Sequence, residues 1–124
     1  MKDNKAAIFE GQQFLNLETF RRSGEAVQTP VWFVEDDGML YVRTIDNSGK
    51  VKRIRNNPRV RVAPCDVRGG LLGEWGEAQA HLVDEPTAQR VDQLLEDKYG
   101  EQKRSFDQMS RSQNIKRATI AIEL

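Results

Sequence analysis

The sequence predicts a mainly β fold, a small antiparallel barrel of six or seven strands with one late helix. Three observations lead to it: apolar residues alternate with period two through the first two-thirds of the chain, turn residues separate the alternating segments, and the chain has only 124 residues. An open sheet in so short a chain would expose its edges, and closing the strands into a barrel removes them. This length suits one hydrophobic core, so we expect residues 1–124 to form a single domain.

The first three predicted strands form a meander. The segments "FLNLETF" (14–20), "AVQTPVWFV" (26–34) and "MLYVRT" (39–44) alternate, with turn residues between them. Asp37-Gly38 is typical of a tight hairpin because both residues accept the positive φ angles that such turns require.

The rest of the chain mixes helices and strands. We expect a short helix at residues 49–56, capped by Ser48 or Asn47, and a longer one that begins at Asp84 or Glu85 and ends at Gly100. The apolar stripe of the longer helix consists of Ala88, Val91, Leu94 and Leu95. The other predicted elements are a strand at 59–65, a strand at 71–83 bent at Gly73 and Gly76, a helical turn at 105–112 and a last strand at 117–124.

The composition excludes several classes of protein. Apolar residues make up 38% and charged residues 31% of the chain, which is typical of an ordinary globular protein. No apolar run approaches the roughly 20 residues that cross a bilayer, and the first residues are too polar for a secretory signal. Cys65 has no second cysteine to pair with, and together with the single His81 it is too little for a zinc site. We therefore expect no metal, no membrane contact and a cytoplasmic location.

The formal net charge of zero hides an uneven distribution of charge. Residues 43–68 contain eight Lys or Arg and two acidic residues, whereas the remainder contains eleven basic and seventeen acidic residues. Opposed blocks of this kind indicate a localised anion site more than a general affinity for polyanions.

The predicted helix at residues 49–56 carries the core of this basic block. At about 100° per residue, Val51 and Ile54 share one side and can anchor the helix to the barrel. The basic side chains lie on two flanks, Lys50 with Arg53 and Lys52 with Arg55. These cations and the free N–H groups after Ser48 can hold a phosphate. Two alternatives remain open: a solvated basic face, and a nucleic-acid-binding patch that the acidic remainder of the chain would oppose.

Aromatic residues and a proline mark a second candidate region. Pro30 lies inside a predicted strand and removes a hydrogen-bond donor, which indicates an edge, a bulge or a bend where backbone groups are free to face a ligand. A plain edge strand is the alternative. Trp32 and Phe33 point to opposite faces, so we expect one in the core and the other in a pocket or a subunit interface. Trp75, between flexible glycines, overhangs a cofactor or packs in the core.

Four stretches resemble the pyridoxamine-phosphate-oxidase-like split-barrel proteins: "TFRRSGEAVQTPVWFV", "GMLYVRT", "SGKVKRIRNNPRVRVAPCD" and "GEWGEA". The similarity covers residues from about 12 to 124 and is strongest to the branch assigned to deazaflavin (coenzyme F-420) dependent enzymes. It implies a six-stranded FMN-binding type of split barrel that forms a homodimer, with two flavin-type cofactors in clefts between the subunits.

The resemblance also implies which residues contact the cofactor. The backbone of residues 28–31 would run along the tricyclic ring, Arg43 and Thr44 would lie beside it, and basic residues of the helix would hold the phosphate. The full set is Gln28, Thr29, Pro30, Val31, Arg43, Thr44, Ser48, Lys50, Lys52, Arg53 and Trp75. The cofactor would be coenzyme F-420 or FMN, and both present a phosphate and a tricyclic ring.

The function implied is an oxidoreductase that passes hydride from the reduced deazaflavin, or from reduced FMN, to an unsaturated organic substrate. The chain lacks the C-terminal extension with which pyridoxamine phosphate oxidases contact substrate, so that activity is not expected. We expect no catalytic acid or base, because the cofactor carries the hydride and the protein binds and orients. Alternatives are a flavin-binding or storage protein without turnover and a nucleic-acid-binding barrel.

Overall fold

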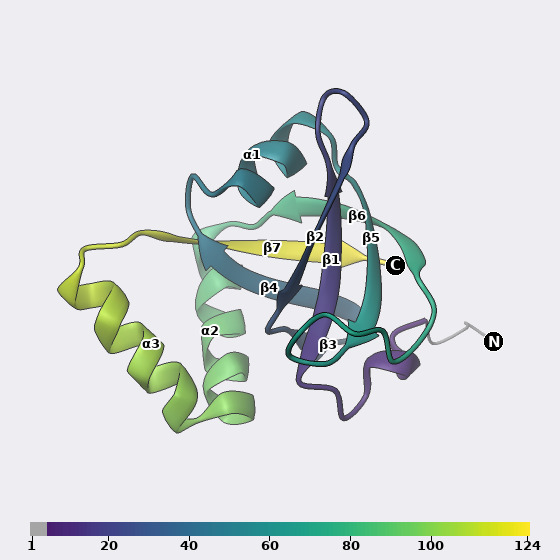
Figure 1. Cartoon of the computed structure of the whole chain (residues 1–124). Helices are drawn as coiled ribbons and strands as arrows, with labels where there is room; N and C mark the ends of the chain where they lie inside the picture. Colours follow the sequence, from purple (N-terminus) through teal and green to yellow (C-terminus); the bar gives the residue numbers. More distant parts are fainter. Residues whose placement is uncertain (1–4) are drawn as a thin grey trace.

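The computed structural model describes residues 5–124, which contain seven strands, three α-helices and one short 3-10 helix (Figure 1). In chain order the elements are η1 (Ala7–Phe9), β1 (Phe14–Phe20), β2 (Ala26–Val31), β3 (Val34–Asp36), β4 (Met39–Ile45), α1 (Gly49–Asn56), β5 (Arg59–Cys65), β6 (Gly76–Leu82), α2 (Glu85–Tyr99), α3 (Glu101–Ser112) and β7 (Arg117–Glu123).

All seven strands belong to one antiparallel sheet in the order β2-β1-β5-β6-β7-β4-β3. The sheet curls into a half-barrel but does not close, so β2 and β3 are its edges (Figure 1). The predicted mainly β fold with six or seven antiparallel strands is therefore confirmed. Pro30 lies on the edge strand β2, where its missing N–H costs no ladder hydrogen bond.

The local signals for turns and caps produce the structure they predict. Asp37 and Gly38 have φ angles of 53° and 83° and connect β3 to β4. Helix α1 has the predicted bounds, and the Ser48 hydroxyl accepts a hydrogen bond from the Val51 N–H at 3.5 Å. Helix α2 begins after Asp84, whose carboxylate accepts from the Thr87 N–H at 3.0 Å.

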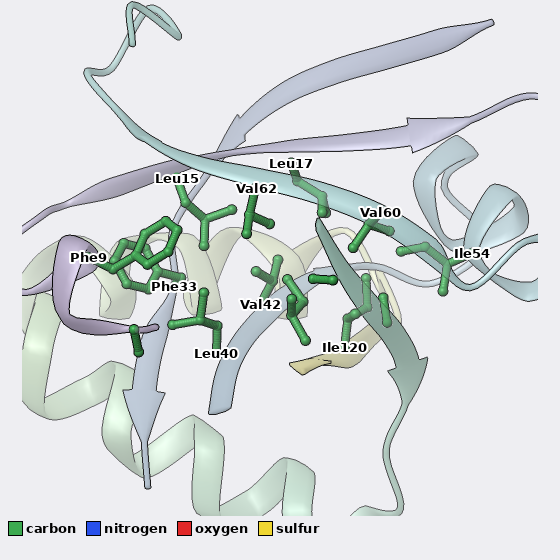
Figure 2. Close-up of a cluster of buried hydrophobic side chains, with 14 of the residues drawn as sticks. Phe9, Leu15, Leu17, Phe33, Leu40, Val42, Ile54, Val60, Val62 and Ile120 are labelled. Carbon is green, nitrogen blue, oxygen red and sulfur yellow. The ribbon is translucent and has the colours of Figure 1, made fainter. Parts of the chain in front are cut away.

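The main core lies inside the half-barrel and is filled by alternate residues of the strands (Figure 2). Val51 and Ile54 of α1 are buried in it, which confirms the predicted anchoring side of this helix. Phe33 is also part of this core, whereas Trp32 packs against a second cluster between the sheet and α2. The two neighbouring aromatic residues thus point to opposite faces, as predicted.

The predicted strand at residues 26–34 is interrupted, because α2 takes over the backbone hydrogen bonds of Phe33. The Phe33 N–H donates to the Tyr99 hydroxyl at 3.0 Å, and Lys98 Nζ donates to the Phe33 carbonyl at 2.8 Å. These bonds replace those to a neighbouring strand, so β2 ends at Val31 and β3 begins at Val34.

Two further boundaries differ from the prediction. The strand expected at 71–83 begins at Gly76, and before it only an isolated bridge joins Leu71 to Cys65. Asp66 closes the preceding turn by accepting from the N–H groups of Arg68 and Gly70. The helical turn expected at 105–112 is the twelve-residue helix α3, so the C-terminal half has two helices where one was predicted.

Helices α2 and α3 lie outside the sheet. Helix α2 covers the outer face near β3, β4 and β7 through a second apolar cluster that includes Tyr41, Val91 and Leu95. Helix α3 turns back beside α2 after Gly100 (Figure 1). No helix within residues 5–124 is long and apolar enough to span a membrane.

Candidate functional site

A cleft of about 380 Å³ opens where the half-barrel fails to close. Phe14, the last two residues of β2 and the following Trp32 form one wall of the cleft. Residues 43–45 of β4 form another wall. Side chains of α2 and α3 and the segment before β7 complete it. The lining is mostly apolar, and the volume lies in the range typical of small-molecule sites.

Both strands at this cleft have a free backbone edge. Strand β3 pairs only with residues 39–41 of β4, so residues 43–45 pair with β7 alone. Strand β2 pairs only with β1 within the described part of the chain. Unpaired backbone N–H and C=O groups therefore flank an apolar cavity, and such groups can recognise the polar rim of a flat ligand.

An aromatic cluster stands at one end of the cleft. The rings of Trp32 and Tyr99 stack with centroids 4.3 Å apart and an interplanar angle of 7°. Phe106 of α3 meets the Trp32 ring edge-on, at 5.1 Å and 89°. Tyr99 is held in place because its hydroxyl also donates to the Gln13 carbonyl at 2.8 Å.

A basic cluster lies at the other end of β2, formed by Lys50 and Arg53 of α1 with Arg21 nearby. Burial lowers the pKa of Lys50, and the charge of Arg53 lowers it further. Burial also lowers the pKa of Arg53, with a smaller effect from Arg21. Within residues 5–124, no carboxylate forms an ion pair with Lys50 or Arg53. Two uncompensated cations on one helix flank are the electrostatic signature of an anion site.

The basic cluster and the cleft are joined along β2. Arg53 Nε donates to Thr19 Oγ1 at 2.7 Å, and Thr19 lies opposite Val27 in the sheet. Pro30, where the cleft begins, is three positions after Val27, which corresponds to roughly 10 Å of extended strand. A ligand with a flat ring in the cleft and a phosphate on a short chain could lie along this edge.

The structure thus brings together predicted residues that are distant in sequence. Pro30, Val31, Arg43 and Thr44 line one cleft. Thr29 precedes them on β2, Ser48 caps α1, and Lys52 is exposed on the other flank of the helix.

Gln28 and Trp75 belong to another group of side chains, on the outer face of β1 and β5. Gln28 donates to the buried Glu18 at 2.7 Å, and Arg61 Nε lies 3.0 Å from the other oxygen of Glu18 with its N–H not aligned to donate. The Arg61 guanidinium covers the Trp75 ring at 4.9 Å. Trp75 does not line the apolar cleft, so its contact with a cofactor stays a prediction.

Among the described residues, His81 and Cys65 have no neighbouring side chain that would make them a catalytic base or nucleophile. His81 is exposed on β6. Cys65 is buried, and burial raises the pKa of its thiol, with a further contribution from Asp66. Nucleophilic cysteines require a lowered thiol pKa and access to substrate, so the buried Cys65 is suited to packing.

An ionic network beside the cleft was missed by the sequence reasoning. Lys103 Nζ lies 3.0 Å from Asp92, 3.3 Å from Glu96 and 2.5 Å from Asp107. Arg43 pairs with Asp92, and Arg117 pairs with Asp107. Burial alone would raise the pKa of Asp107, but hydrogen bonds from Lys103 and Arg117 hold it below its usual value. The only local signal was the i,i+4 spacing of Lys103 and Asp107.

The same arginines separate the apolar cleft from a larger polar one. This second cleft, of about 510 Å³, lies between α2 and the ends of β4 and β7. Arg43 and Arg117 line both clefts, and Asp92 lies on the polar side. These arginines form the boundary of the apolar cleft. Because each is already paired with a carboxylate, neither adds an uncompensated positive charge to the cleft.

Comparison with known proteins assigns the family. The sequence profile described as pyridoxamine 5'-phosphate oxidase matches residues 1–124. The chain belongs to this family. No curated protein sequence gives a significant match.

Solved structures of similar proteins share the split barrel. A conserved hypothetical protein of Mycobacterium tuberculosis is 27% identical over 98% of this chain and 79% of its own, with a TM-score of 0.71. An FAD-binding protein of Mesorhizobium loti is 13% identical over 96% and 84%, with a TM-score of 0.63. The heme storage protein HutZ of Vibrio cholerae is 16% identical over 94% and 84%, with a TM-score of 0.71. The two more distant likenesses show the fold alone.

The site of this member of the pyridoxamine 5'-phosphate oxidase family fits a flavin-type group. The cleft supplies apolar walls and two free backbone edges for a tricyclic ring, and the basic cluster supplies charge for a phosphate. Asn16, opposite Pro30 in the sheet, has a buried Oδ1 without a hydrogen-bond partner among residues 5–124, so a polar group beside this strand is unsatisfied.

Proposed function

We propose that this protein is a homodimeric oxidoreductase that binds coenzyme F-420 or FMN and passes hydride to an unsaturated organic substrate. The observation that carries the proposal is the meeting of Pro30, Val31, Arg43 and Thr44 at one apolar cleft with free backbone edges. The cofactor would supply the hydride chemistry. We place the reaction in the cytoplasm, as the sequence predicts.

The chain's own residues bind, orient and exclude water. The free edge of β2 fixes the rim of the ring, and the apolar lining keeps water from its faces. Lys50 and Arg53 neutralise the phosphate. Both side chains are only partly exposed to solvent, and this burial lowers their pKa values. Interactions with an anion are stronger in such surroundings than in water.

The second copy of the chain is expected beside this cleft. The turn at residues 66–70 contacts β1 through a hydrogen bond from Asn16 Nδ2 to the Gly69 carbonyl at 3.2 Å. Val67, Leu71 and Leu72 near this turn are 64%, 50% and 58% exposed. Gly69 of the same turn lies against the ring of Pro30, which lines the cleft. Exposed apolar residues on such a turn favour a partner subunit that completes the site.

A cofactor-binding or storage protein without turnover is the second candidate. It is supported by the likeness in fold to the V. cholerae heme storage protein. It is also supported by the cleft lining, where the titratable side chains Arg43, Lys103 and Arg117 are all held in ion pairs.

The decisive experiment is a fluorescence titration of the purified protein with FMN and with coenzyme F-420. We expect one of them to bind, and Lys50→Ala with Arg53→Ala to weaken binding at least about tenfold, because a charge-assisted hydrogen bond contributes about 1.5–3 kcal/mol. Arg55→Ala, which removes a positive charge from another flank of α1, should leave affinity nearly unchanged. Unchanged affinity of the double variant would show that Lys50 and Arg53 do not bind the cofactor phosphate.

Turnover separates the two candidates once a cofactor is known. The reduced cofactor is mixed anaerobically with the protein and a panel of unsaturated carbonyl and nitro compounds, and its reoxidation is followed by absorbance. Oxidation that depends on both protein and acceptor supports the oxidoreductase. Tight binding without acceptor-dependent oxidation supports storage, and binding of duplex DNA in place of either cofactor would contradict both.

A further inference from the structure

Helix α3 buries a charge and exposes its apolar side chains. Within Glu101–Ser112 the only buried residue is Lys103, which is 4% exposed. Phe106 and Met109 remain 50% and 46% exposed. A surface helix ordinarily buries its apolar stripe and leaves lysines in water. The apolar side of α3 is therefore not accounted for by packing within the chain.

That apolar side faces the cleft. Phe106 and Met109 line it together with Pro30 and Val31 of β2. Phe106 touches Trp32 only edge-on, which leaves much of its own surface exposed. An aromatic side chain half exposed in an apolar cleft is suited to packing against a flat conjugated ring.

Ion pairs are the main contacts that hold α3 in this position, because its one buried side chain is that of Lys103. Lys103 contacts carboxylates on α2 and on its own helix, namely Asp92, Glu96 and Asp107. Arg43 of β4 and Arg117 of β7 connect the same carboxylates to the sheet. A lysine this buried is tolerated only because it is fully paired, so its loss would free the helix from its seat.

We propose that Phe106 and Met109 are the ring-contacting wall of the cleft, and that Lys103 is the residue that positions this wall. The ligand is a planar, conjugated and largely apolar ring system. The proposal rests on the proposed function and adds binding residues on α3 to those of β2, β4 and α1.

The wall is tested by titrating wild type and variants with FMN and coenzyme F-420. Phe106→Ala and Met109→Ala should each weaken binding, Phe106→Ala by about tenfold, while Phe106→Tyr should keep affinity close to wild type because it keeps the ring. Gln108→Ala, on the exposed side of the same helix, is the matched control. Wild-type binding with unchanged affinity of Phe106→Ala and Met109→Ala would overturn this inference alone. Absence of wild-type binding would overturn the proposed function as well.

The positioning role of Lys103 is tested by a double-mutant cycle. If Lys103 acts by holding the wall, Phe106→Ala should have little further effect on affinity in a Lys103→Met background. Asp107→Asn removes one carboxylate partner of Lys103 and leaves the lysine in place. In this background too, Phe106→Ala should have little further effect on affinity. Lys103→Arg, which keeps the positive charge, should bind nearly as well as wild type. Additive effects of Phe106→Ala in both backgrounds would show that Lys103 has no part in positioning the wall.

Discussion

Tyr99 shows how one buried hydroxyl can interrupt a strand. It accepts from the Phe33 N–H and lies 3.0 Å from the Phe33 carbonyl, and it donates to Gln13. Burial raises the pKa of this phenol to about 12. Its side chain also supports Trp32 at the cleft by stacking. The sequence pattern marked residues 26–34 as one strand because alternation continues through Trp32, and it contained no sign of a tyrosine 66 positions away.

Lys98, next to Tyr99, leads to a prediction about pH. Burial lowers its pKa from 10.5 to about 8. Between these values the unfolded chain holds a proton that the folded chain has lost, so raising the pH favours the folded state. We expect the free energy of unfolding of wild type, relative to Lys98→Met, to increase between about pH 8 and pH 10.5. Urea unfolding at a series of pH values measures this difference.

The free energy of unfolding is compared with that of Lys98→Met because other groups titrate in the same pH range. The raised pKa values of Cys65 and Tyr99 act in the opposite direction, since the folded state there holds protons that the unfolded chain loses first. Both groups are present in wild type and variant, so most of their contribution cancels in the difference. Parallel stability curves for the two proteins would mean that Lys98 has an ordinary pKa.

At the scale of elements, α1 is the clearest success of local reasoning. Its cap, its bounds and its buried side all follow from residues 48–56, and the structure reproduces each. We expect Val51→Asp to lower the free energy of unfolding by more than about 3 kcal/mol, because an unpaired charge would enter the core. Denaturant unfolding measures this loss. Lys52→Asp on the exposed flank should change stability little, and equal losses in both variants would mean that the helix faces are assigned wrongly.

Helix α3 shows the opposite case. Its sequence has no sustained apolar stripe, and the contacts that seat it join Lys103 to Asp92, and through Arg43 and Arg117 to strands far away in the chain. Ion pairs between residues far apart in the chain follow no helical or strand periodicity, so a single sequence does not reveal them. The candidate site divides in the same way: the residues of β2, β4 and α1 could be named beforehand, whereas the α3 wall of the cleft could not.

At the scale of the whole molecule, the sheet stays open, and this opening creates the site. A closed barrel would pair the free edges of β2 and β4 and leave no cleft between them. The sequence predicted closure as the remedy for exposed edges. In the described chain, α1 packs into the core of the half-barrel and α3 lines part of the cleft, and the β2 edge remains available.

The remaining exposed apolar surface predicts how two copies meet. Leu71 and Leu72 follow the turn that contacts Asn16, and their backbones bridge to Cys65 and Pro64 at the end of β5. If they form the dimer interface, Leu71→Glu together with Leu72→Glu should convert a dimer to a monomer in light scattering, because paired carboxylates would be buried against apolar surface. Gln108→Glu adds a carboxylate on the exposed side of α3, outside both the patch and the cleft lining, and as the control it should leave the mass unchanged.

The same variant also tests whether the partner completes the site. A cleft shared between subunits should lose affinity for its ring ligand when the dimer dissociates, although the substituted leucines line none of its walls. Monomers that bind FMN or coenzyme F-420 as tightly as wild type would show that each subunit holds a whole site. A dimer that persists with both glutamates in place would move the interface to another surface of the half-barrel.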